Sequence, residues 1–290
     1  MKRNVLSFAG TIVLIPALFF SCERRSSTLV NPSGASEDPP VIVEAVGLEA
    51  LYESLDAVLY RYVEPCSGKV NYNGFWADPE LDSICGRIAR FDMGALEIRT
   101  DSLAFLLNAY NAMFIRQLRA YMPNDSVTPG DMVPWERMFD DTLTVAGHRT
   151  TLDQLEKNDS SFIKRFNEPR THFVLNCGAK SCPPLLGKAY RGGTLYQALD
   201  YQTKRFIRNG RFNPLESSPP TVSQLFSWYA GEFSGMVRDP NPDNDRKLAT
   251  LENATVKDFI GSYLSDPLKL SRLASEGLSF KVYNWEINQL

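Results

Sequence analysis

Residues 170–185 contain the densest group of side chains with catalytic chemistry. The segment includes His172, Cys177 and Cys182. A cysteine is a nucleophile when it is ionised to the thiolate, and a histidine within hydrogen-bonding reach can take up its proton. This combination of residue types predicts thiol chemistry.

The local sequence predicts how this segment positions its side chains. Residues 171–175 have the composition of a short buried strand, followed by a turn at Gly178. The two prolines after Cys182 favour the first turn of a helix, so Cys182 is expected at a helix N-terminus. The partial positive charge of that terminus would lower the pKa of Cys182, with His172 as its base.

Other interpretations of the same cysteines stay open. Cys177 and Cys182 are close enough in sequence for a local disulfide, or both are inert buried thiols. A zinc site with His172 lacks a fourth ligand at a typical spacing, so we predict no metal and no cofactor. A thiol redox site is a further interpretation, although the gap differs from that of the thioredoxin-like Cys-x-x-Cys motif.

Two asparagines on a predicted helix are the second candidate group. The apolar pattern of residues 101–121 indicates a helix, and Asn108 and Asn111 are three residues apart on it. As catalytic residues they would orient a substrate or the His172 ring, or stabilise an oxyanion. The structural interpretation is that both amides bind neighbouring loop backbone, as buried amides need partners.

Weaker candidates are expected to be structural. His148 follows a glycine in a predicted turn and is expected to be exposed, as is Glu156 on its helix. Glu156 would otherwise support a site near His172. Trp228 and Tyr229 are expected in the core and not on a sugar-binding platform.

The composition excludes several functions. Lysine and arginine total 31 and aspartate and glutamate 34 in 290 residues, which gives a net charge of -3. Without a basic surplus we expect no nucleic-acid partner, because such binding depends on cations that neutralise phosphates. Two histidines cannot form a three-histidine zinc site, and five cysteines are too few for a disulfide scaffold.

The N-terminus predicts export and lipidation. Residues 1–22 have a basic start, a short apolar run and a small residue before Cys22, as in a lipoprotein-type signal peptide. Residues 23–42 are rich in serine, proline and acidic residues, which indicates a flexible tether. We therefore expect a lipid on Cys22 to anchor the protein in the bacterial cell envelope, in the periplasm or at the outer membrane, with the membrane as its partner.

Residues 43–290 are predicted to form a single globular domain. Hydrophobic residues make up 43% of the chain, and helical periodicity dominates over short, scattered strands. The predicted fold class is α+β, a helix-rich domain with a few short strands. Helices are expected at residues 45–63, 79–88, 101–121, 151–156, 194–208, 223–233 and 256–264, and strands at 142–145, 171–175 and 280–283.

Several motifs, taken in order, resemble one protein family. They are residues 68–72, 103–112, 151–156, 168–173, 176–185 and 282–288, among them Leu-Leu-Asn-Ala-Tyr-Asn-Ala and Asn-Cys-Gly-Ala-Lys-Ser-Cys-Pro-Pro-Leu. Together they resemble the domain of unknown function 547 family, over residues 48–290. The resemblance implies an exported bacterial protein, and the family has no established activity.

One position departs from the family pattern. The family often has a histidine after the pair that corresponds to Leu155 and Glu156, and this chain has Lys157 there. If that histidine is a general base in the family, this chain lacks it, which leaves His172 as the candidate base.

These observations support competing functions. The first is a thiol-dependent hydrolase or acyl transferase, with Cys182 as nucleophile, His172 as base and Asn108 or Asn111 as the orienting group. The alternative is a non-catalytic envelope protein that binds a small molecule, glycan or protein, with a structural Cys177–Cys182 disulfide. Thiol redox chemistry by the same pair of cysteines ranks third.

Overall fold

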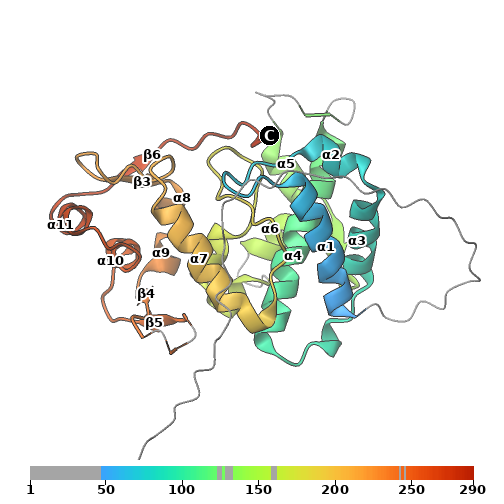
Figure 1. Ribbon diagram of the computed structural model, residues 1–290, viewed down its shortest axis with the longest axis horizontal. Helices are drawn as coiled ribbons and strands as arrows, with labels where there is room; N and C mark the ends of the chain where they lie inside the picture. Colours follow the sequence, from blue (N-terminus) through green and yellow to red (C-terminus); the bar gives the residue numbers. More distant parts are fainter. Residues whose placement is uncertain (1–46, 123–125, 128–132, 158–161, 242, 245) are drawn as a thin grey trace, which may run out of the picture. The chain divides into compact units, whose positions relative to one another are not determined.

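The computed structural model describes residues 47–122, 126–127, 133–157, 162–241, 243–244 and 246–290 (Figure 1). The predicted signal peptide 1–22, with Cys22, and the tether 23–42 lie outside the described residues. None of the described helices has the length and apolar composition that a bilayer span requires.

The predicted helix-rich α+β domain is confirmed for the described part of the chain. The α-helices are α1 (Leu48–Tyr62), α2 (Tyr72–Ala77), α3 (Pro79–Arg90), α4 (Arg99–Leu118), α5 (Trp135–Asp140), α6 (Leu152–Glu156), α7 (Leu195–Ile207), α8 (Leu225–Trp228), α9 (Ala230–Phe233), α10 (Val256–Gly261) and α11 (Pro267–Ser275). Short 3-10 turns include η5 (Pro169–Phe173) and η6 (Gly192–Thr194).

The described strands form three separate pairs. The antiparallel pairs are β1 (Leu143–Val145) with β2 (His148–Thr150) and β4 (Met236–Arg238) with β5 (Leu248–Thr250). The parallel pair joins β3 (Thr221–Ser223) to β6 (Ser279–Lys281) and so ties the C-terminal segment to the chain before α8.

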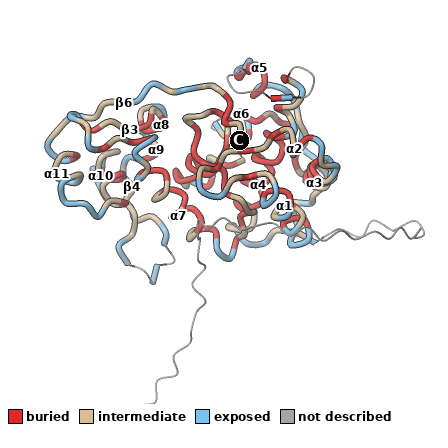
Figure 2. Tube along the Cα trace, turned by 45° about the horizontal axis from the view of Figure 1, so that its top comes forward, coloured by how far each residue is buried: buried red, intermediate tan, exposed pale blue. Residues whose placement is uncertain are grey.

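Helix α4 is the central helix of the domain. Its side chains are buried on nearly all sides between Leu103 and Leu118, and Figure 2 shows this burial along the trace. It contacts α2, α3, α6 and η6. The indole N–H of Trp76 in α2 donates to the backbone oxygen of Ile115 at 2.8 Å, which satisfies a polar group that the core would otherwise leave unpaired.

A second apolar cluster joins η5 to the C-terminal helices. Phe173 stacks on Phe233 with ring centroids 5.5 Å apart and packs against Phe206 of α7 at 5.2 Å. Phe259 of α10 lies 4.8 Å from Phe233. Aromatic pairs at these distances stabilise a core beyond the area they bury, so this cluster holds η5 in place.

The segment with the candidate cysteines differs from the prediction. Residues 169–173 form the 3-10 turn η5 instead of a strand, because Pro169 occupies its first turn and the Glu168 side chain accepts the Arg170 N–H. No helix begins at Pro183 either, and residues 182–191 are irregular. The predicted helix 223–233 is divided into α8 and α9 at Tyr229, whose φ of -109° and ψ of 23° leave the helical region.

Gly178, where the sequence predicts a turn, tests the packing behind this segment. Its φ is +74°, and a Cβ atom would lie 2.6 Å from the ring of Phe114. Gly147 has a φ of +77° with open space around it, so it is the matched control. We expect Gly147→Ala to lower the free energy of unfolding by about 1–2 kcal/mol, the cost of left-handed backbone.

We expect Gly178→Ala to cost about 1–3 kcal/mol more than Gly147→Ala, because the added methyl group overpacks the core. Denaturant unfolding of the two variants measures the difference. Equal losses of unfolding free energy in the two variants would show that the Phe114 ring moves aside at no energetic cost.

Candidate active site

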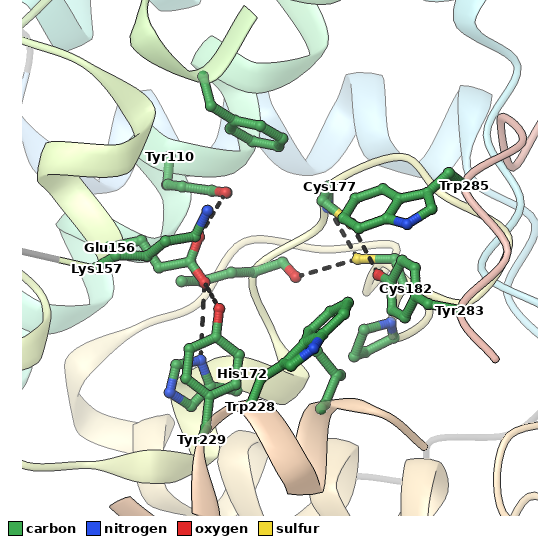
Figure 3. A pocket seen from close by; sticks show the side chains of 14 residues that line it. Tyr110, Glu156, Lys157, His172, Cys177, Cys182, Trp228, Tyr229, Tyr283 and Trp285 are labelled. Carbon is green, nitrogen blue, oxygen red and sulfur yellow. Dashed lines mark hydrogen bonds and ion pairs between the residues drawn. The ribbon is translucent and has the colours of Figure 1, made fainter. Parts of the chain in front are cut away.

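A cavity of about 300 Å³ lies at the segment that the sequence singles out (Figure 3). Its walls come from α4, α5, α6, η5, the irregular segment 174–183, α8 and the C-terminal segment after β6. The lining residues are Tyr110, Phe139, Glu156, Lys157, His172, Leu175, Cys177, Cys182, Pro183, Leu225, Trp228, Tyr229, Tyr283 and Trp285.

Cys177 is the thiol whose surroundings favour the ionised form. Its side chain is half-buried at the cavity wall, and its sulfur lies 3.2 Å from the Tyr283 hydroxyl. Burial alone would raise the pKa of Cys177, but hydrogen bonds from the Cys182 thiol, the Tyr283 hydroxyl and the Ala179 backbone N–H lower it below its ordinary value. A thiolate that accepts several hydrogen bonds is a nucleophile near neutral pH.

Cys182 has the opposite environment, so the lowered pKa that the sequence predicts for this thiol is wrong. Its side chain is only 4% exposed, and its sulfur accepts the Cys177 backbone N–H at 2.9 Å. Burial and the neighbouring Cys177 sulfur raise the pKa of Cys182 well above its ordinary value. The expected helix N-terminus is absent from this described segment, and the hydrogen bonds from the Cys177 N–H and the Tyr283 hydroxyl, which lower the pKa of Cys182, do not outweigh burial.

The two cysteines are free thiols, so the predicted Cys177–Cys182 disulfide is not formed in this structure. The Cys182 sulfur instead accepts the Cys177 N–H and its thiol donates to the Leu175 carbonyl at 3.7 Å. The side chain of Asn176 supports the turn between them, since it accepts the Gly178 N–H at 2.8 Å and donates to the Pro183 carbonyl at 3.2 Å.

His172 is held between two carboxylates and does not pair with Cys182. Its Nε2 lies 2.9 Å from Glu232 and its Nδ1 3.7 Å from Glu156. Burial lowers the pKa of His172, but the two carboxylates outweigh burial and raise it above its ordinary value. The ring also stacks on Tyr229 with centroids 3.6 Å apart. A protonated imidazole fits this position, because it neutralises buried negative charge.

Glu156 is a buried centre of hydrogen bonds, so the prediction of an exposed glutamate is wrong. Its side chain is 11% exposed and accepts the hydroxyl protons of Tyr110 at 2.9 Å and Tyr229 at 3.2 Å. Burial raises its pKa, but contacts with His172, Lys157 and Tyr110 keep it below its ordinary value. The cavity therefore holds an ionised carboxylate opposite Cys177 (Figure 3).

Lys157 lines the cavity next to Glu156. Its ammonium group donates to Asp153 at 2.6 Å and lies 5.1 Å from the ring centre of Phe139. Burial opposes its charge, but the carboxylates of Glu156 and Asp153 raise its pKa. Lys157 therefore carries a positive charge in the cavity and does not act as a neutral base.

The two predicted asparagines are positioning residues and do not line this cavity. Asn108 donates to the Tyr190 carbonyl at 2.8 Å and accepts its N–H at 2.9 Å. Asn111 donates to the Val174 carbonyl at 3.0 Å and accepts the Asn176 N–H at 2.8 Å. With both side-chain groups bound to loop backbone, the structural interpretation holds and neither amide faces the cavity as an oxyanion donor.

Aromatic residues that the sequence assigned elsewhere form a wall of the cavity. Trp228 was expected in the core but is 47% exposed, because α8 ends there and turns the indole outward. Its ring lies 4.9 Å from Tyr283 and 5.9 Å from Trp285. His148 is exposed, as predicted, in β2.

Sequence reasoning missed Glu232, Tyr110 and Tyr283. Glu232 comes from α9, Tyr110 from α4 and Tyr283 from the C-terminal segment. The only sequence signal for Tyr110 and Tyr283 is that they lie in the family motifs 103–112 and 282–288, and Glu232 has no such signal. Among the described residues, no group of three or more histidine, cysteine, aspartate or glutamate side chains has the geometry to hold a metal ion.

The comparison with known families agrees with the resemblance found in the sequence. Residues 94–207 match the family described as protein of unknown function, DUF547. The matched segment runs from the turn before α4 to the end of α7 and includes both cysteines, His172 and Glu156. No significant match was found among curated proteins or solved structures.

The charge on His172 predicts a pH-dependent stability. Because the pKa of His172 is raised above about 6.5, its protonated form stabilises the fold fully below that pH and the contribution is lost as pH rises through the folded-state pKa. We expect the difference in unfolding free energy between wild type and His172→Gln to shrink between about pH 6 and pH 9.

Denaturant unfolding over this pH range measures that difference, with His148→Gln, at the exposed histidine, as the control. The His148→Gln difference should not follow this trend. A constant difference for His172→Gln would contradict a charged His172 between Glu156 and Glu232.

Proposed function

We propose that the protein is a thiol-dependent hydrolase or acyl transferase in which Cys177 is the nucleophile. The observation that carries the proposal is the position of the Cys177 sulfur. It lies at the wall of a cavity, accepts hydrogen bonds from its surroundings, and faces the buried acid–base group of Glu156, Tyr110 and Lys157. Covalent catalysis needs an activated nucleophile and a nearby group that transfers protons.

The first half of the reaction forms a thioester. The Cys177 thiolate bonds to the carbonyl carbon of an ester, thioester or amide, and the carbonyl electron pair moves to its oxygen. Lys157 offers positive charge to this oxyanion. The oxyanion then collapses, the bond to the leaving group breaks, and that group takes a proton from Lys157, which regains one from Glu156 in the second half of the reaction.

The second half releases the acyl group. A water molecule or an acceptor amine attacks the thioester and gives a proton to Glu156, whose pKa is held low enough for it to be ionised. The Cys177 thiolate is the leaving group and is restored. His172 keeps its proton throughout and positions both Glu156 and Glu232.

An acyl-transfer assay tests this assignment. We expect p-nitrophenyl acetate to transfer one acetyl group to Cys177, and Cys177→Ser to slow p-nitrophenol release on the order of a hundredfold or more. Intact-protein and peptide mass spectrometry locate the acetyl group. Cys182→Ser keeps a donor beside Cys177 and should keep most of the reactivity.

The matched control for thiol loss is Cys85→Ser, because Cys85 is a free, buried thiol in α3 that faces the backbone of Ala112. Acetylation of Cys182, or equal rates in the wild type and Cys177→Ser, would overturn the proposal. The exposed Trp228 next to Trp285 supports the alternative of a binding protein. Quenching of tryptophan fluorescence by a glycan without any acylation would favour that alternative.

We further propose that a lipid on Cys22 anchors the domain in the bacterial cell envelope. The support is the order of a basic start, a short apolar run and a cysteine after a small residue in residues 1–22. The serine- and proline-rich residues 23–42 would let the domain stand off the membrane surface.

Detergent-phase partition of the full chain expressed in a bacterium tests the anchor. The wild type should enter the detergent phase, and Cys22→Ser should move to the aqueous phase because the acyl chains supply the membrane affinity. Cys177→Ser is the control and should partition like the wild type. Detergent partition of Cys22→Ser unchanged from the wild type would rule out lipidation at this cysteine.

A further inference from the structure

The two thiols at the cavity differ in a way that acyl transfer does not use. We infer that Cys177 and Cys182 form a dithiol–disulfide exchange centre, in which Cys177 attacks a substrate disulfide and Cys182 resolves the mixed disulfide. This activity uses the same nucleophile as the proposed acyl transfer but does not depend on it.

Access sets the order in which the two thiols react. Cys177 is half-buried at the cavity wall, whereas Cys182 is 4% exposed. A disulfide that enters the cavity therefore meets the Cys177 sulfur, and Cys182 is left to react with the bond that Cys177 forms. Attack from the accessible thiol and resolution by the buried one is the arrangement that thiol–disulfide exchange requires.

The turn between the cysteines brings the two sulfurs together. The Cys177 N–H donates to the Cys182 sulfur at 2.9 Å, and the Cys182 N–H donates to the Ala179 carbonyl at 3.0 Å. Gly178, with its φ of +74°, closes the turn. The Cys182 sulfur therefore lies 2.9 Å from the backbone nitrogen of Cys177 itself, within the same turn as the Cys177 side chain.

The C-terminal segment holds this turn from outside. The backbone N–H of Lys180 donates to the Glu286 carbonyl at 2.7 Å, and that of Ser181 donates to the Asn284 carbonyl at 3.2 Å. The Lys180 side chain also pairs with the Glu286 carboxylate. Both cysteines are therefore fixed on one braced turn, which keeps the resolving sulfur beside the attacking one.

Electrostatics also favours this sequence of steps. The negative charge of the Cys177 thiolate is one cause of the raised pKa of Cys182, after burial. Once Cys177 is bonded to a substrate sulfur, that charge is gone and Cys182 loses its proton more readily. The buried thiol is thus inactive before the first step and activated by it.

The two steps balance as follows. The Cys177 thiolate sulfur bonds to one sulfur of the substrate disulfide, the substrate S–S bond breaks, and the other half leaves as a thiolate that takes a proton from water. The Cys182 sulfur then bonds to the Cys177 sulfur, and the second half of the substrate leaves with the Cys182 proton. The protein dithiol is oxidised by two electrons and the substrate disulfide is reduced to two thiols.

Equilibration with mixtures of reduced and oxidised glutathione tests the inference on the purified full chain. The wild type should form a Cys177–Cys182 disulfide, visible as a cross-linked peptide, with little glutathione attached. Cys182→Ser and Cys182→Ala should trap glutathione on Cys177, about tenfold more than in the wild type, because the resolving thiol is absent.

Cys177→Ser should bind no glutathione at Cys182. Cys85→Ser is the matched control and should behave as the wild type, because burial raises the pKa of Cys85 to about 12 and keeps that thiol outside the exchange. Stable glutathione adducts on Cys177 in the wild type, with no cross-linked peptide, would overturn the inference.

The acetylation assay on the same samples separates this inference from the proposed function. Acetylation of Cys177 without any cross-link under oxidation would leave the acyl transferase standing and remove the exchange centre. A reversible cross-link in a protein that p-nitrophenyl acetate does not acylate would support the exchange centre and remove the acyl transferase.

Discussion

Two side-chain amides on one buried helix hold the segment on which the site is built. Asn108 and Asn111 lie one turn apart on α4, and each binds both a carbonyl and an N–H of loop backbone. Asn111 holds the chain just before Cys177, and Asn108 holds it at Tyr190, after Cys182. Residues 174–190 have little regular secondary structure, so few of their backbone groups are paired within it. The two amides supply some of the hydrogen bonds that a helix or sheet would otherwise make.

The charges at the cavity depend on that anchored backbone. Glu156, His172 and Glu232 come from α6, η5 and α9, and a buried carboxylate is tolerated only where an opposite charge or several donors compensate it. Here the imidazole of His172 compensates both carboxylates, and the hydroxyl groups of Tyr110 and Tyr229 complete the shell of Glu156. The cavity therefore keeps ionised groups next to an apolar aromatic wall.

The pKa values of the two thiols differ because of the groups around each sulfur and not because of the local sequence. The sequence favours Cys182 as the nucleophile, because two prolines follow it, and gives no local signal that singles out Cys177. Tyr283 and the Ala179 N–H reach the sulfur of Cys177, while Cys182 is enclosed behind it. The Tyr283 hydroxyl, from the C-terminal segment more than 100 residues away in the chain, is thus one of the groups that lower the pKa of Cys177.

The helix-rich class, the main helices, the resemblance to the family that matches residues 94–207, and the segment with the cysteines and His172 could all be predicted from the sequence. These features rest on local periodicity, turn residues and motif order, which are readable along the chain. Only the tertiary structure decided that residues 171–173 are a 3-10 turn, that Glu156 is buried, and that His172 pairs with carboxylates. Burial, pKa and pairing depend on residues that are distant in sequence, such as Glu232 and Tyr283, and no local pattern records which of them will meet.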